Sequence, residues 1–259
     1  MQYTNKNYLK EVLKTKGKAS AAWAQAASNI TTEILGEAGF DVVFIDMEHA
    51  PGDIQTLITQ IHALKGLDTV PLVRATWNDF VLIKRILDAG AYGLLVPYVN
   101  TVEEAEEVVK AVRYPTAGIR GVAGSPRAAH YTNNSMDYMN AANNEIFVMV
   151  AVETMTAVEN LEEIVKIDGI DGIFIGPNDL ASSMGYLCNP KVPKVQDTIK
   201  RIENIVLPTG KTLATTSGSF EDAKAKYERG YGIITLMSDT SSMSKFARGL
   251  VDQFKGAFG

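Results

Sequence analysis

Residues 70–98 read VPLVRATWNDFVLIKRILDAGAYGLLVPY, and this stretch contains the pattern that decides the fold. Two short apolar runs, Val70–Ala75 and Tyr92–Tyr98, flank a helical segment that stops at Asp88-Ala89-Gly90. Glycine readily adopts the left-handed conformation in which many helices end, so the stretch predicts a strand–helix–strand unit. Continuously apolar runs of this length are typical of strands buried on both faces of a parallel sheet.

The same alternation extends in both directions along the chain. Further strands are predicted at residues 19–24, 41–47, 146–152, 172–175, 211–216 and 231–237. Amphipathic helix patterns lie between them, as at 54–64 and 102–112, with apolar residues three and four apart. Eight such units in 259 residues predict a single-domain (β/α)8 TIM barrel over residues 1–259 rather than an open doubly wound sheet. The first strand, ASAAWA, is also compatible with a helix.

One connection departs from this regular pattern. Residues 114–145 are rich in Gly, Asn, Ala and Pro and show no sustained period. They predict a long loop before the fifth strand, and loops of this length are commonly functional.

Composition and charge exclude several classes of partner. The net charge of −5 argues against nucleic acids and anionic membranes, which favour clustered basic residues. The apolar run Ile146–Val152 is far shorter than a membrane-spanning helix. The N-terminus lacks the apolar core of a secretory signal, and the single cysteine, Cys188, excludes an internal disulfide. We therefore expect a cytoplasmic protein.

Polar residues follow several of the predicted strands at their carboxyl ends, where the active sites of (β/α)8 barrels lie. They are Asp46-Met47-Glu48-His49 after the second strand, Arg74 after the third, Glu153 after the fifth, Gly176-Pro177-Asn178-Asp179 after the sixth and Ser238-Asp239 after the eighth. Acidic groups this numerous are costly to bury unless they are paired or bind a metal. The alternative is a set of salt-bridged loop caps.

Glu153 and Asp179 are the candidate metal ligands, because carboxylate oxygens suit hard ions such as Mg2+ and Mn2+. Two carboxylates would leave positions for a chelating 2-oxo acid. His49 is the candidate general base, since its ordinary pKa lies near neutrality, and Asp46 could orient its imidazole. Arg74 could stabilise an enolate oxyanion. No lysine follows a strand at this end, which disfavours Schiff-base chemistry.

Six segments in order carry a resemblance to a known family. They read FIDMEHAPGD (44–53), VPLVRAT (70–76), LDAGAYGLLVPYV (87–99), GIRGVAGSPRAAHY (118–131), VETMTAVENLEEI (152–164) and IFIGPNDLASSMG (173–185). Together they resemble the HpcH/HpaI aldolases, which are metal-dependent class II pyruvate aldolases. The resemblance covers nearly the whole chain. It implies reversible cleavage of a 4-hydroxy-2-oxo acid into pyruvate and an aldehyde.

The resemblance also implies roles for individual residues. The base falls on His49, the transition-state arginine on Arg74, and the ligands of a Mg2+, Mn2+ or Co2+ ion on Glu153 and Asp179. Substrate contacts fall on Arg74 and on Gly176, Pro177, Asn178 and Asp179, with backbone groups at Asn178 and Asp179 holding the pyruvate carboxylate. The family further implies a homo-oligomer, commonly a hexamer arranged as a trimer of dimers, with the C-terminal helix exchanged between subunits.

Two positions qualify these expectations. Asp88 matches a family aspartate that raises the basicity of the histidine, but it ends a helix at the far end of its own barrel. We therefore expect it to act on His49 of a neighbouring subunit. Ala151 replaces a family glutamine that contacts pyruvate. Two alternatives therefore stay open: a lyase or decarboxylase acting on a 2-oxo diacid or an acyl-CoA, and a non-catalytic barrel that binds a 2-oxo acid.

Overall fold

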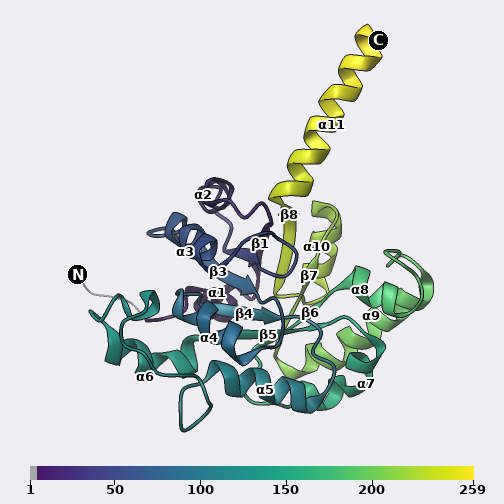
Figure 1. Cartoon of the computed structure of the whole chain (residues 1–259). Helices are drawn as coiled ribbons and strands as arrows, with labels where there is room; N and C mark the ends of the chain where they lie inside the picture. Colours follow the sequence, from purple (N-terminus) through teal and green to yellow (C-terminus); the bar gives the residue numbers. More distant parts are fainter. Residues whose placement is uncertain (1–4) are drawn as a thin grey trace.

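Eight parallel strands close into a barrel in the computed structural model, which describes residues 5–259 (Figure 1). Each strand pairs with its neighbours along the chain, and the last strand pairs with the first. The strands are β1 (Ala19–Ala24), β2 (Val42–Asp46), β3 (Val70–Arg74), β4 (Gly93–Val96), β5 (Phe147–Val152), β6 (Gly172–Ile175), β7 (Thr212–Thr216) and β8 (Ile233–Ser238). The predicted (β/α)8 barrel is confirmed, and Ala19–Ala24 is a strand.

The helices of residues 5–259 flank the barrel, except for the last, which projects from it. They are α1 (Tyr8–Lys16), α2 (Asn29–Glu37), α3 (Ile54–Ala63), α4 (Phe80–Asp88), α5 (Val102–Val112), η1 (Arg127–Ala129), α6 (Ser135–Glu145), α7 (Met155–Ile164), α8 (Pro177–Ser183), α9 (Pro193–Val206), η2 (Leu207–Thr209), α10 (Phe220–Glu228) and α11 (Asp239–Phe258). Seven of them begin at a side chain that accepts a hydrogen bond from the backbone N–H three residues later: Ser28, Asp53, Asp79, Thr101, Thr154, Ser219 and Ser238. These caps satisfy N–H groups that have no partner within the helix, so they fix where each helix starts.

The barrel interior is filled by apolar side chains. Trp23, Phe44 and Phe174 form an aromatic cluster whose ring centroids lie 4.9–5.9 Å apart. Leu72 and Ala151 belong to the same buried cluster. The interior is therefore a packed core rather than a pore, as in other barrels of this type. Polar side chains at the strand ends lie beyond this core.

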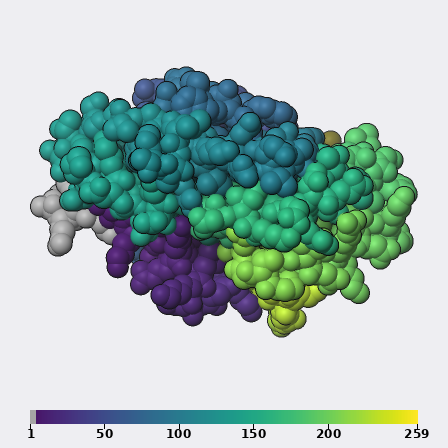
Figure 2. Space-filling model, turned by 90° about the horizontal axis from the view of Figure 1, so that it is seen from below, coloured from purple at the N-terminus to yellow at the C-terminus, as the bar shows by residue number. Residues whose placement is uncertain are grey.

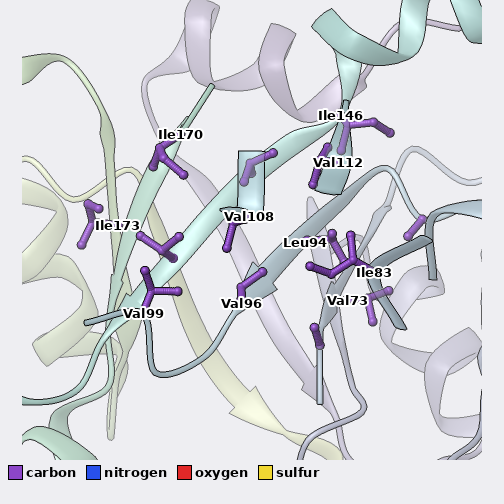
Figure 3. Close-up of a cluster of buried hydrophobic side chains, with 14 of the residues drawn as sticks. Val73, Ile83, Leu94, Val96, Val99, Val108, Val112, Ile146, Ile170 and Ile173 are labelled. Carbon is purple, nitrogen blue, oxygen red and sulfur yellow. The ribbon is translucent and has the colours of Figure 1, made fainter. Parts of the chain in front are cut away.

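A second apolar layer lies between the strands and the outer helices. Figure 3 shows Val73, Leu94 and Val96 from β3 and β4 beside Ile83 of α4 and Val108 of α5. All five side chains are fully buried. Seen from below in Figure 2, the purple, teal and green elements follow one another around the molecule. This packing holds the helices against the barrel and keeps the strand ends in fixed positions.

The segment between α5 and β5 contains more structure than the sequence predicted. It includes η1 and the eleven-residue helix α6, where a long loop was expected. The helix was missed because its sequence, SMDYMNAANNE, has no apolar stripe and buries only Ala142. Arg120, which is fully buried, anchors the segment through a 2.8 Å ion pair with Asp88, and its guanidinium lies over the Tyr114 ring.

The last helix, α11, projects away from the barrel (Figure 1). Its exposed apolar residues recur three and four apart, as Met243, Phe246, Leu250, Phe254 and Phe258. Such a stripe on one helix face is typical of a helix that packs against another surface. Among residues 5–259, no helix combines the length and hydrophobicity that crossing a membrane requires.

Candidate active site

The polar residues at the barrel mouth are placed by the two-residue period of the strands. Successive side chains of a strand point to opposite faces, so residues two apart share a face. Four apolar residues that face the barrel interior (Trp23, Phe44, Leu72 and Ala151) are each followed two positions later by a polar residue at the end of the strand: Gln25, Asp46, Arg74 and Glu153. The same period places Gly176 two positions after Phe174. These strand ends together form the mouth.

Asp46 and Arg74 form a two-pronged ion pair between β2 and β3. Arg74 Nε lies 2.9 Å from Asp46 Oδ1, and Arg74 Nη2 lies 2.6 Å from Asp46 Oδ2. Burial alone would raise the pKa of Asp46, but the hydrogen bonds and charge of Arg74, with a hydrogen bond from Gln25, lower it overall. The guanidinium also lies over the Trp23 ring, 4.5 Å from its centroid, and Arg74 Nη1 is 3.1 Å from Glu48 Oε2. Arg74 is therefore held on all sides.

His49 lies at the rim, and its side chain is 65% exposed. We expected Asp46 to orient the imidazole, but Asp46 contacts only the backbone N–H of His49, at 3.3 Å. The Asp46 carboxylate is instead bound to Arg74, whose fixed charge and paired donors make it the stronger partner. The nearest acid to the imidazole is Glu48, whose Oε2 lies 3.8 Å from His49 Nε2.

Glu153 is a buried carboxyl group with a strongly shifted pKa. Its residue is 4% exposed, and its Oε2 accepts a 3.2 Å hydrogen bond from the Tyr98 backbone N–H. Burial, helped by the charges of Asp179 and Glu48, raises the pKa of Glu153 to about 7. A Cβ on Gly176 would lie 2.5 Å from Glu153 Oε1. Only glycine leaves space for the carboxylate at this point.

The segment after β6 forms the first turn of a short helix. Gly176 precedes α8, Pro177 occupies its first position, and Asn178 and Asp179 complete the turn. The first N–H groups of a helix have no carbonyl partner within it and favour negative charge. The Asp179 carboxylate interacts electrostatically with both Glu153 and Glu48.

Three carboxylates thus converge on one side of the mouth: Glu48, Glu153 and Asp179. Burial, together with the charges of Asp46 and Asp179, raises the pKa of Glu48 as well. Mutual repulsion between oxygen ligands of this kind is relieved by a hard divalent cation, so the residues fit such an ion. Over residues 5–259 no group of three or more His, Cys, Asp or Glu side chains has the arrangement of a complete metal site. Glu48, Glu153 and Asp179 are near enough for their charges to interact, but they do not form such a group.

One polar residue at the mouth was missed by sequence reasoning. Gln25 follows β1, donates to Asp46 Oδ2 over 3.0 Å and accepts a 2.7 Å hydrogen bond from the Ser238 hydroxyl. Its position two residues after the inward-facing Trp23 could have identified it. Asp239 has a local role here, since its carboxylate binds the backbone N–H groups of Gln25 and Ala26.

Asp88 lies at the C-terminal end of α4, away from the mouth of its own barrel, where it pairs with Arg120. The structure therefore does not bring Asp88 and His49 of one chain together. Lys211 directly precedes β7, and its side chain binds the carbonyl groups of Ile167 and Ile170.

A cavity of about 580 Å3 lies beside the N-terminal ends of β3 and β4, at the end of the barrel opposite the mouth. It is lined by residues that include His62, Arg127 and His130. None of the polar residues of the mouth lines it, so the cavity is separate from the candidate site.

Comparisons with a family model and with individual sequences relate the chain to the same group of aldolases. The sequence model of the HpcH/HpaI aldolase/citrate lyase family matches residues 19–245. The chain is 39% identical to a 4-hydroxy-2-oxo-heptane-1,7-dioate aldolase from Escherichia coli, over 96% of this chain and 95% of that protein. It is 41% identical to a 5-keto-4-deoxy-D-glucarate aldolase from Escherichia coli O157:H7, over 96% and 97% of the two chains.

Comparison with solved structures agrees. A protein from Burkholderia cenocepacia J2315, described as belonging to the HpcH/HpaI aldolase/citrate lyase family, superposes with a TM-score of 0.91. The two sequences are 33% identical, and the match covers 96% of this chain and 99% of the other.

Proposed function

The chain belongs to the HpcH/HpaI aldolase/citrate lyase family, and on this premise we propose that it is a divalent-metal-dependent aldolase acting on 4-hydroxy-2-oxo acids. The reaction would be reversible cleavage to pyruvate and an aldehyde. The observation that carries the proposal is the buried Glu153 carboxyl beside Asp179, on the same mouth as the fixed Arg74 guanidinium.

Glu153 and Asp179 would hold the cation, which would be Mg2+, Mn2+ or Co2+. When bound, the cation would supply Lewis-acid polarisation of the 2-oxo group. The backbone N–H groups of Asn178 and Asp179, in the first turn of α8, would bind the pyruvate carboxylate, with Gly176 and Pro177 completing that wall.

His49 would take the proton from the C4 hydroxyl group of the substrate. The bond between C3 and C4 then breaks, the aldehyde leaves, and the electron pair forms the enolate of pyruvate. Protonation of that enolate at C3 completes the reaction. Arg74, held by Asp46 and Glu48, would face the charge that develops during cleavage. Because its partners fix it beforehand, the guanidinium needs little reorganisation in the transition state.

The proposal is tested by supplying the purified protein with each cation in turn and a panel of 4-hydroxy-2-oxo acids. The panel includes the substrates for which the two Escherichia coli relatives are named. Released pyruvate is measured with a coupled dehydrogenase, and chelator-treated protein is the control. Release of carbon dioxide without an aldehyde would indicate a decarboxylase instead, and binding without turnover would indicate a non-catalytic barrel.

Metal binding should depend on pH through Glu153. Because its pKa is raised to about 7, a proton competes with the cation below neutral pH. We expect the association constant for Mn2+ to fall about tenfold per pH unit below pH 7 and to level off above it. Titration calorimetry between about pH 5.5 and about pH 8.5 measures this.

His49→Asn is the control for this measurement, because His49 is the proposed base and lies at the same mouth. The pH dependence should persist in His49→Asn. A dependence that disappears with the imidazole would assign the proton to His49 and contradict the role of Glu153.

We also propose that the enzyme is a homo-oligomer. The family resemblance implies a hexamer. The apolar stripe of α11 is supporting evidence, since it projects from the barrel with Phe246 and Phe254 respectively 71% and 64% exposed. Exchange of α11 between subunits would cover this stripe. In such an assembly Asp88 of one subunit would approach His49 of another.

Placing charges on the stripe should therefore disrupt the assembly. We expect Phe246→Asp with Leu250→Asp to sediment as a monomer under conditions in which the unaltered protein is an oligomer. Lys245→Asp, at an exposed position on the same helix, is the control and should leave the assembly intact. Equal sedimentation of all three proteins would show that the stripe is not an interface.

A further inference from the structure

Gln25 connects the Asp46–Arg74 pair to the end of β8 and the start of α11. It lies one residue beyond β1, and its backbone N–H donates a 2.8 Å hydrogen bond to Asp239 Oδ1 at the start of α11. Its side-chain nitrogen lies 3.0 Å from Asp46 Oδ2, and its side-chain oxygen accepts from Ser238 Oγ at 2.7 Å. The amide therefore links the ends of three neighbouring strands, β8, β1 and β2.

The orientation of the amide is set by its two neighbours. The ionised Asp46 carboxylate only accepts hydrogen bonds, so the amide N–H groups must face it, and the amide oxygen then accepts from the Ser238 hydroxyl. The reverse orientation would place the amide oxygen against a carboxylate. Gln25 is thus a donor of defined direction, although glutamine itself is uncharged.

The orientation of the Asp46 carboxylate is fixed by five hydrogen bonds. Oδ1 accepts from Arg74 Nε and from the backbone N–H groups of Glu48 and His49, while Oδ2 accepts from Arg74 Nη2 and from Gln25. Among these donors, Gln25 is the one that comes from the end of β1; the others come from β3 and from the loop after β2. Without it, Asp46 Oδ2 would keep only its hydrogen bond with Arg74 Nη2.

We propose that Gln25 is a positioning residue: its amide holds Asp46, and Asp46 in turn holds Arg74 in the orientation that meets the developing enolate. The inference rests on the proposed function. It gives the end of β1, which carries no proposed acid, base or metal ligand, an indirect part in catalysis. Gln25 acts on the reaction through Arg74.

The test begins with Gln25→Leu, which removes both side-chain hydrogen bonds while keeping similar volume. Because Arg74 acts on charge that forms only in the transition state, kcat should fall about ten- to a hundredfold. The KM should change less than about threefold, since ground-state binding is retained. A purely structural role would lower the melting temperature without this division between kcat and KM.

Gln25→Glu gives a second readout, in the pH profile. A protonated glutamic acid can donate to Asp46 and accept from Ser238, as the amide does. An ionised one cannot donate, and it is repelled by Asp46 and Asp239, although Arg74 lies nearby. The activity of Gln25→Glu should therefore be present at low pH and fall as pH rises through a new ionisation absent from the unaltered enzyme.

Gln60→Leu is the matched control. Gln60 is also buried and makes one side-chain hydrogen bond, to Thr32, but it lies on α3 outside the mouth. Gln60→Leu should lower stability while leaving the kcat, the KM and the pH profile unchanged. Unaltered kcat in Gln25→Leu, or an unaltered pH profile in Gln25→Glu, would overturn the inference.

A measurement independent of turnover separates this inference from the proposed function. The Nε–H signal of Arg74 in nitrogen-15 NMR, assigned by its loss in Arg74→Lys, should be sharp in the unaltered protein and broadened in Gln25→Leu. If no substrate releases pyruvate but this change is seen, the proposed function fails and the positioning role stands. An unchanged Arg74 signal refutes the positioning role, whatever the activity.

Discussion

Glu153→Gln should abolish activity and at the same time make the metal-free protein more stable at alkaline pH. The amide cannot serve as an anionic ligand, so we expect kcat/KM to fall by about a thousandfold or more, or about 4 kcal/mol. Its oxygen can still accept the hydrogen bond from Tyr98, so the local structure should persist. Turnover and Mn2+ titration together measure the loss.

The stability change has a defined sign. The pKa of Glu153 rises from an ordinary 4.5 to about 7 on folding, so the ionised carboxylate destabilises the metal-free fold above pH 7, by roughly 3 kcal/mol. That penalty is absent below about pH 4.5, where the group is protonated in both the folded and unfolded states. The melting temperature of Glu153→Gln should therefore be higher than that of the unaltered apoprotein at about pH 8 and equal to it at low pH. A variant that is less stable at every pH would contradict this account of the site.

Arg74→Ala should lower kcat by about a hundredfold or more while leaving Mn2+ affinity nearly unchanged. Removing a preorganised group that faces developing charge commonly costs about 3–4 kcal/mol in the transition state. Arg74 contacts neither proposed ligand directly, being held by Asp46 and Glu48. Steady-state kinetics and metal titration distinguish the two effects.

Arg74→Ala also leaves the Asp46 carboxylate buried without its cationic partner, which typically costs about 3–5 kcal/mol of folding stability. Adding Asp46→Asn removes that unpaired charge. The double variant should therefore recover much of the stability but none of the activity. Activity that returns together with stability would show that Arg74 is structural only.

The barrel was predictable because strands buried on both faces of a parallel sheet have short, continuously apolar sequences. Ala19–Ala24 and Gly172–Ile175 are strands with the predicted bounds, since polar or glycine residues interrupt the run on each side. Helix α6 was not predictable in this way, because its stability depends on contacts with the rest of the chain rather than on an apolar period of its own.

The positions of the predicted strand ends indicated which residues reach the mouth but not how they pair. Asp46, Arg74 and Glu153 were expected there, and the structure places them there. That Asp46 would bind Arg74 rather than the imidazole of His49 depends on competition between partners, which spacing along the chain does not express. Gln25 escaped notice because glutamine has neither charge nor nucleophile, and its role comes only from its neighbours.

The closure of the barrel has a consequence for how the protein acquires activity during synthesis. The amide of Gln25, which by our proposal holds Asp46 and through it Arg74, also accepts a hydrogen bond from Ser238 at the end of β8, and its backbone N–H donates to Asp239. A nascent chain that has emerged from the ribosome only as far as β7 contains His49, Arg74, Glu153 and Asp179, but it lacks Ser238 and Asp239, the partners of Gln25. If Gln25 has the proposed role, full activity therefore requires that β1 and β8 have paired.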